Sequence, residues 1–259
     1  MPGHYAHYRF AASQLQHMDG ETRKTVNRFR QLYDVGAQGP DPLFCSNPFL
    51  KRKKFALGHQ IHMEPGRLFF ERAGRIYRAQ PTEGAYAYLL GCLTHFCLDS
   101  SCHPFVNAVD EAGEGKHIAL ETEFNRFLME LDGKNDPHTY NPGKYLTLSA
   151  GGCETAAAFY KGMTPRAFAQ CVGGMKLFHG LFAAPEGLPR NVVAGVTKAI
   201  GHGGFVMTKG PDPEHCAFNQ PMLELYEQAL QRFPGMLAQL QGHLRTGAPL
   251  GEEFNAIYG

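Results

Sequence analysis

The chain has 259 residues, of which 43% are hydrophobic and 19% charged, so it can build a packed core and is not intrinsically disordered. Its 25 Lys and Arg residues balance 24 Asp and Glu residues, so the net charge does not indicate a broad basic face for nucleic acid or anionic membranes. No run of about 18 apolar residues predicts a transmembrane helix. The N-terminal residues lack the pattern of a secretory signal, so we expect a cytoplasmic protein whose seven cysteines, none in a CxxC pair, are free and mostly buried thiols.

In chain order, apolar residues at helical spacing predict helices joined by loops rich in Gly and Pro. Thr82 is a suitable N-cap for a helix over 82–101, and we expect His103-Pro104 to end that helix. No run alternates β-branched residues as strands do. The sequence therefore predicts one all-α domain over residues 1–259, with an irregular Gly/Pro-rich C-terminal portion around 184–221. The predicted helices cover 21–34, 53–79 (divided at Pro65-Gly66), 82–101, 116–131, 156–163, 165–181 and 221–244.

The helix over 82–101 is apolar around much of its circumference, which is typical of a helix at the centre of a bundle. It carries His95 and Asp99 four residues apart, so both lie on one helical face, and His103 follows four residues later. The next helix repeats the spacing with His117 and Glu121. Imidazole and carboxylate ligands held on rigid helices suit zinc, and they are also compatible with manganese or iron.

These five side chains exceed the three protein ligands that one catalytic zinc usually takes. Two or three metals therefore fit better, and Asp99 is the natural bridge because each of its oxygens can bind one metal. A pair of metals about 3.5–4 Å apart is the usual arrangement for phosphoester hydrolysis. The competing interpretation is a set of ordinary helix-surface pairs, but an isolated His95 or Asp99 would be costly to bury in so apolar a helix.

Further ligands must come from outside these two helices. Asp41 follows a helix stop, where a loop carboxylate can reach into the mouth of a bundle. His59 and His62 are three residues apart, so only one of them is expected to face the site. The N-terminal residues offer His4 and His7.

Together these residues resemble the zinc-dependent phospholipase C and S1/P1 nuclease superfamily, and most closely its bacterial branch of zinc-dependent phospholipase C proteins. The resemblance covers roughly residues 1–135 and implies an all-helical domain with three zinc ions. It implies that His62 and His95 hold one metal and that Asp99 bridges it to a second, held by His7 and the N-terminal amine. The positions that match in order are His7, Asp41, His62, His95, Asp99, His103, His117 and Glu121.

Within that resemblance, Asp41 is expected near the second metal as ligand or general base, and a third metal would take His103, His117 and Glu121. The chain departs from the secreted enzymes in two ways. It has no Trp, whose free amine binds zinc in those enzymes, so removal of Met1 would have to supply the amine of Pro2. The spacer between Asp99 and His103 is also shorter, which shifts His103 along the helix end.

We therefore expect a metal-dependent hydrolase of phosphoric esters, a phosphodiesterase of phospholipase C type that uses a metal-bound water, with Asp41 as its catalytic residue. A phospholipid substrate, reached by peripheral membrane contact, would use an apolar rim; a nucleotide substrate, as in a nuclease, would use the basic run 51–54. A non-catalytic protein whose metals only hold the helices together is the third alternative. The sequence does not indicate the oligomeric state. Candidates for the rim are Phe44, Phe49, Phe55, Phe69, Phe70 and Phe105.

Overall fold

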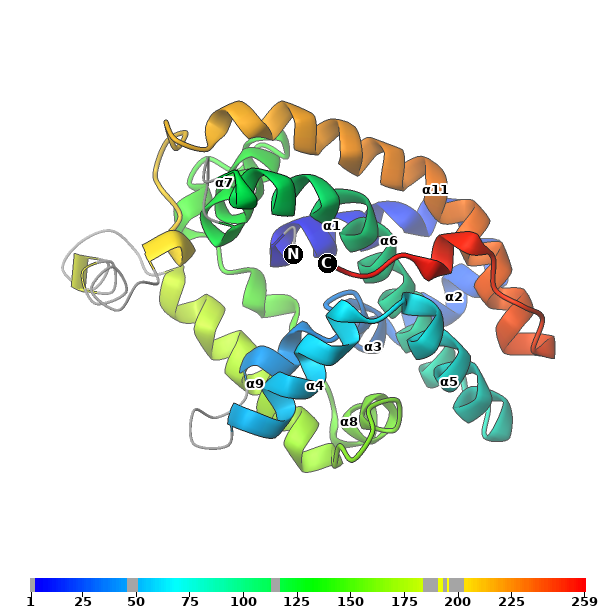
Figure 1. Cartoon of the computed structure of the whole chain (residues 1–259). Coiled ribbons are helices and arrows are strands. Elements are labelled where there is room, and N and C mark those ends of the chain that lie inside the picture. The colour runs from blue at the N-terminus through cyan, green and yellow to red at the C-terminus, as the bar shows by residue number, and fades with distance from the viewer. Residues whose placement is uncertain (1–2, 46–50, 113–116, 184–190, 193–194, 196–202) are drawn as a thin grey trace.

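The computed structural model describes residues 3–45, 51–112, 117–183, 191–192, 195 and 203–259, and the side chains of 51–55 lie outside this description. Within these ranges the chain is helical, and extended pairing is limited to an isolated antiparallel bridge between Pro65 and Ile257 (Figure 1). The all-α prediction is therefore confirmed. Among the same residues, the length and apolarity that a membrane crossing requires are not combined in any helix.

The helices vary in length from single turns to the two long helices α6 and α11. The α-helices are α1 (His4–Gln14), α2 (Gly20–Arg28), α3 (Arg30–Gly36), α4 (Lys51–Met63), α5 (Gly66–Ala79), α6 (Glu83–Glu111), α7 (His117–Leu131), α8 (Ala150–Ala157), α9 (Pro165–Phe182) and α11 (Asn219–Thr246). Short 3₁₀ segments cover Leu15–His17, Asp41–Cys45, Pro137–Thr139, Pro142–Tyr145, Gly203–Phe205, Cys216–Phe218 and Glu252–Asn255.

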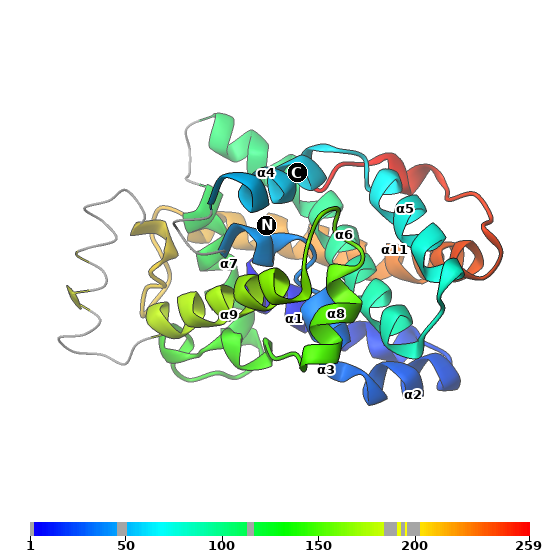
Figure 2. The same ribbon diagram turned by 90° about the horizontal axis from the view of Figure 1, so that it is seen from below.

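Helix α6 lies at the centre of the fold, packed against α1, α3 and α11 (Figures 1 and 2). Thr82 caps it, because its hydroxyl accepts a hydrogen bond from the N–H of Ala85. The prediction that His103-Pro104 closes this helix was wrong, since α6 continues through Pro104 to Glu111. A proline inside a helix costs about 3 kcal/mol. Burial of residues on both sides of it, including Cys102 and Val106, offsets that cost.

Two glycines allow α3 and α6 to approach closely. A Cβ on Gly36 would lie 2.4 Å from the carbonyl oxygen of Tyr88, and a Cβ on Gly91 would lie 2.3 Å from that of Tyr33. Directly after α3, Gly39 has a positive φ of 51°, and a Cβ there would lie 2.2 Å from the ring of His95. This contact brings the start of the Asp41–Cys45 segment next to the central helix.

Other boundaries differ from the predictions. The helix predicted over 21–34 is two helices, α2 and α3, which meet at Phe29 with a non-helical ψ of 36°. The prediction of a helix over 156–163 was wrong. Helix α8 spans Ala150–Ala157, because the hydroxyl of Ser149 caps its N-terminus. The division at Pro65-Gly66 and the helix at 165–181 are confirmed as α4, α5 and α9. All seven cysteines are free, and five of them are buried.

Candidate metal centre

Four helices and one 3₁₀ segment supply the eight side chains that the sequence predicts as ligands. Helix α6 contributes three of them on one face, because His95, Asp99 and His103 each lie about one turn apart. Helix α7 supplies His117 and Glu121. The remaining ligand candidates are His7 on α1, His62 on α4 and Asp41 at the start of Asp41–Cys45.

Around Asp99 two groups of side chains meet, and both include His95. In the first group, Oδ1 of Asp99 lies 3.1 Å from Nε2 of His7, and Oδ2 lies 2.9 Å from Nε2 of His95. In the second group, Oδ1 of Asp41 lies 3.1 Å from Nε2 of His62 and 3.9 Å from Nε2 of His95. The two oxygens of Asp99 thus face different imidazoles, and Oδ2 is also 3.9 Å from Nε2 of His62.

These atoms are buried and close together, yet they are not arranged as hydrogen bonds. The side chains of His95 and Asp99 are fully buried, and their facing atoms have no hydrogen-bond partner of proper geometry; the same holds for both carboxylate oxygens of Asp41. Ligands about 2 Å from a tetrahedral zinc lie roughly 3.3 Å from each other. The observed separations, 2.9–3.9 Å, match that spacing. The residues present therefore fit a divalent cation such as zinc.

A third group, made of His103, His117 and Glu121, lies where α6 and α7 meet. Oε1 of Glu121 is 2.7 Å from Nε2 of His117 and 3.8 Å from Nε2 of His103. Burial differs within the group: Glu121 and His103 are buried, whereas the side chain of His117 is 29% exposed. This group is therefore the one open to solvent among those three.

Backbone carbonyls fix the orientation of two imidazoles. Nδ1 of His62 donates to the carbonyl of Gly58 at 2.8 Å, and Nδ1 of His103 donates to the carbonyl of Tyr258. In both rings this arrangement assigns the proton to Nδ1 and leaves the lone pair of Nε2 for a metal. Hydrogen bonds of this kind are the usual second layer around metal-binding histidines.

The electrostatics keep the central carboxylates ionised. Burial alone raises the pKa of Asp99, but the imidazoles of His95, His103 and His7 outweigh it and hold the pKa well below its usual range. Burial likewise raises the pKa of Glu121, and hydrogen bonds from His103 and His117 contribute to lowering it to about 2. Both carboxylates are therefore charged near neutral pH, which is the form that binds a cation.

The structure brings all eight predicted residues into these three groups, with one change of partners. Asp41 lies with His62 and His95, not with His7 and Asp99 as the resemblance implied. Between the two histidines of α4, His62 faces the group, whereas His59 is exposed. Despite the short spacer, His103 reaches the third group because α6 continues unbroken past it. Residues 1–2, with the predicted N-terminal amine, lie outside the described residues.

Two of the candidates for an apolar rim are core residues instead. Phe69 and Phe70 are buried in the core, where Phe70 packs against Phe96 and Phe254. Of the other candidates, Phe44 and Phe105 are half-buried, and Phe44 lies 5.2 Å from the ring of His62. Phe49, Phe55 and the basic run 51–54 fall outside the described side chains.

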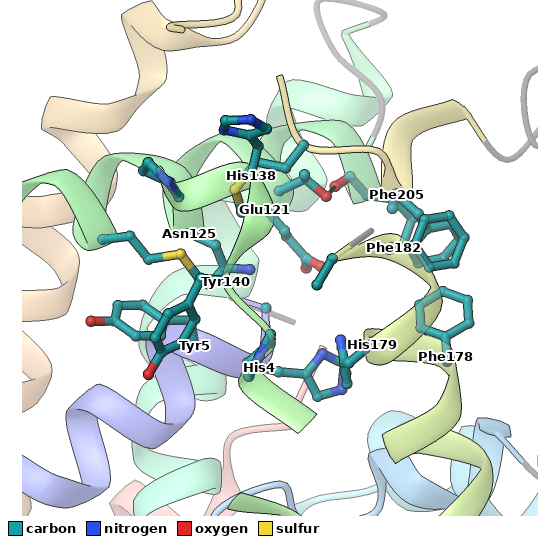
Figure 3. A pocket seen from close by; sticks show the side chains of 18 residues that line it. His4, Tyr5, Glu121, Asn125, His138, Tyr140, Phe178, His179, Phe182 and Phe205 are labelled. Atoms are coloured by element: carbon teal, nitrogen blue, oxygen red, sulfur yellow. Dashed lines mark hydrogen bonds between the residues drawn. The ribbon is translucent and has the colours of Figure 1, made fainter. Parts of the chain in front are cut away.

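Sequence reasoning missed a pocket beside the third group. It is enclosed by α1, α7 and α9, and Figure 3 shows Glu121 and Asn125 on α7 facing His179 and Phe178 on α9. His179 lies in the segment 165–181, for which the sequence predicts a helix and no functional role. Its sequence signal is weak, because a single histidine on a helix is usually a surface or core residue without a ligand. No pattern in the sequence indicates that Tyr258 orients His103, since the two residues are 155 positions apart along the chain.

Comparison with known proteins agrees with this geometry. A family model described as zinc-dependent phospholipase C matches residues 4–161, which contain all eight residues of the three groups. No curated protein and no solved structure gives a significant match. Because the family model spans more than half of the chain and includes the whole set of convergent histidines and carboxylates, the chain belongs to the zinc-dependent phospholipase C family.

Proposed function

We propose that this protein is a zinc-dependent phosphodiesterase of phospholipase C type. The observation that carries the proposal is the convergence of histidine and carboxylate atoms in three groups, of which the two that share His95 hold buried atoms without hydrogen-bond partners of proper geometry. Burying polar atoms in this way is unfavourable unless something satisfies them. Divalent cations at these two groups would satisfy them, and the family of the chain supports zinc.

We assign the ligands by proximity. His7 and Asp99 would hold one ion, Asp41 and His62 a second, and His103, His117 and Glu121 a third. The lone pair of Nε2 of His95 binds one metal, so His95 would complete one of the first two sites, with Asp99 as the bridge between them. Two or three zinc ions are therefore expected. Manganese or iron would suit the same nitrogen and oxygen ligands.

Zinc in these positions supplies positive charge for the phosphoryl oxygens and lowers the pKa of a bound water toward neutrality. The chain itself contributes the general base. Oδ2 of Asp41 is buried and has no hydrogen-bond partner within the described residues, so it can orient a water and accept its proton. The ionised form of Asp99 holds the imidazoles of His7 and His95 in place.

A lipid substrate is supported by the surface next to the pocket. Leu177 and Leu181 lie one turn apart on α9, and their exposed fractions are 76% and 53%. Two of the three residues between them, Phe178 and His179, line the pocket beside Glu121. Two exposed leucines at the edge of a phosphoester site suit contact with the apolar part of a phospholipid layer. The cytoplasmic location and the single domain over 1–259 stay predictions from the sequence.

The test is a metal analysis combined with a substrate panel. Protein purified without a tag or chelator should contain two to three zinc equivalents by elemental analysis. With zinc, it should hydrolyse bis(p-nitrophenyl) phosphate and phospholipid vesicles, and a chelator should abolish both activities. Hydrolysis of single-stranded DNA in place of lipid would favour the nuclease alternative. Bound zinc without any hydrolysis would show that the metals only stabilise the fold.

A further inference from the structure

The pocket beside the third group shares Glu121 with it, so the pocket opens next to that group. The cavity volume is about 90 Å³. A water occupies about 30 Å³ in the liquid, so the cavity has the volume of about three waters. The two acyl chains of a phospholipid do not fit in it. A small headgroup does.

The pocket presents buried nitrogen atoms that lack partners. Nε2 of His4 and Nε2 of His179 are buried and have no hydrogen-bond partner within the described residues, and the two rings lie 3.7 Å apart. On the opposite wall, Oδ1 of Asn125 accepts a hydrogen bond from the N–H of Ala6, so Nδ2 is the atom left to donate. Gly3 makes room for this amide, because a Cβ there would lie 1.8 Å from Nδ2.

The lining offers almost no charge. Among the described residues around the cavity there is no Lys, Arg or Asp, and Glu121 faces His103 and His117. Burial lowers the pKa of His179 to about 4 and, with the neighbouring His179, lowers that of His4 well below its usual value. Near neutral pH both imidazoles are uncharged. Each can then donate or accept one hydrogen bond, which is the chemistry of a hydroxyl partner.

The aromatic residues do not form a cage for a cation. Phe178 packs edge-on against Phe205 at 4.9 Å and tilted against Phe182 at 4.4 Å, so these rings cover one another. The ring of Tyr140 already carries the ammonium of Lys144 at 4.3 Å. A quaternary ammonium needs free ring faces within about 6 Å, and a nearby lysine repels it. The pocket therefore disfavours a cationic headgroup.

We propose that this pocket binds an uncharged, hydroxyl-bearing headgroup of the phosphodiester, of the size of glycerol, through His4, His179 and Asn125. The three residues would determine specificity, and His179 is the best one to test because it lies on α9, which carries none of the eight proposed ligands. This inference rests on the proposed phosphodiesterase function and names its substrate class.

The experiment compares phosphatidylglycerol with phosphatidylcholine of identical acyl chains in mixed micelles, and uses bis(p-nitrophenyl) phosphate as a reference without hydroxyls. The proteins are the zinc-loaded wild type, His179→Leu, His179→Gln and, as a matched control, His17→Leu, which changes an exposed histidine outside the pocket. We expect the wild type to prefer phosphatidylglycerol in kcat/KM. The His179→Leu variant should lower that preference about tenfold, the effect of one lost hydrogen bond of about 1.4 kcal/mol. The amide of His179→Gln should restore most of it.

The outcomes separate the two proposals. If the wild type hydrolyses none of the substrates, the proposed function fails. If it hydrolyses the reference but favours phosphatidylcholine, or if His179→Leu and His17→Leu give the same preference, the pocket assignment is wrong while the function stands.

A binding measurement tests the pocket independently of turnover. Glycerophosphoglycerol should shift the imidazole NMR signals of His4 and His179, and glycerophosphocholine should shift them far less. Equal shifts with both compounds would overturn the inference. Circular dichroism shows whether each variant is folded. If His179→Leu does not fold, His179→Gln, which retains a polar side chain, is the variant used in this measurement.

Discussion

The backbone carbonyl of Tyr258 accepts a hydrogen bond from Nδ1 of His103, so the end of the described chain orients a side chain of the central helix. The segment that carries Tyr258 is anchored on both sides. The carbonyl of Ala256 accepts from the N–H of Gly66 at 2.9 Å, and the N–H of Gly259 donates to the carbonyl of His62 at 3.2 Å. This segment thus links His103 of the third group to α5 and to α4, which carries His62 of the second group.

Removal of residues 258–259 should therefore weaken zinc binding. The deletion takes away the acceptor that fixes the tautomer of His103, and loss of such partners typically lowers metal affinity by about 10- to 100-fold. Chelator competition measures the dissociation constant of the weakest zinc. Deletion of Gly259 alone is the control, because it keeps the carbonyl of Tyr258. Equal affinity in both deletion variants would argue against an orienting role.

Substitutions at Asp99 and His117 should release different amounts of metal. The two oxygens of Asp99 face the imidazoles of two different histidines, whereas His117 belongs to one group. Asp99→Asn is therefore expected to lose close to two zinc equivalents, and His117→Gln about one, since a site that loses one of its protein ligands binds zinc poorly. Elemental analysis of the two purified variants gives the comparison. The same loss in both would mean that Asp99 does not bridge two metals.

The close contact between α3 and α6 makes a stability prediction. A methyl group on Gly91 would meet the backbone of Tyr33 and Ala37, so Gly91→Ala should lower the free energy of unfolding by about 1–3 kcal/mol. Gly235→Ala is the matched control: it lies in α11 with nothing within 4 Å of the added methyl. Because alanine is the better helix former, that variant should gain up to about 1 kcal/mol. Urea unfolding compares them, and a loss in both would assign the effect to helix interiors in general.

Contact with a lipid surface should depend on Leu177 and Leu181. Replacing both exposed leucines with glutamate should reduce hydrolysis of vesicles, since the added charges oppose insertion into the layer, by about tenfold. Hydrolysis of bis(p-nitrophenyl) phosphate should stay the same, because neither residue lines the pocket. Glutamate at Leu131, which is 53% exposed on α7, controls for added charge. Equal losses on both substrates would refute a role at the membrane.

The sequence predicted much of the site because its ligands repeat at helical spacing. His95, Asp99 and His103 share a face for geometric reasons, so their convergence follows once the helix is recognised. Pro104 misled the prediction of the helix end, since local propensity carries no information about the burial that outweighs it. Contacts between residues far apart in the chain, such as Tyr258 and His103, depend on tertiary packing. The helical periodicity of 3.6 residues predicts the helices but not these contacts.

The buried imidazole of His179 predicts a defined pH dependence of stability. Burial, the main cause, lowers its pKa from 6.5 in the unfolded chain to about 4 in the fold, against the opposing charge of Asp41. The unfolded chain then binds more protons than the folded one between these values, so stability falls as the pH drops from 6.5 toward 4. At 1.36 kcal/mol per unit, the loss from this residue is at most roughly 3 kcal/mol.

His179→Gln cannot titrate, and its stability should therefore fall less steeply over the same pH range. The ring of His4 lies 3.7 Å away, and the charge of His179 helps to lower its pKa, so both proteins are compared in a His4→Gln background to isolate His179. Urea unfolding in chelator at several pH values gives both slopes without a contribution from metal release. Parallel slopes would mean that His179 takes up its proton in the folded protein as readily as in the unfolded chain, which contradicts a buried, neutral imidazole at the pocket wall.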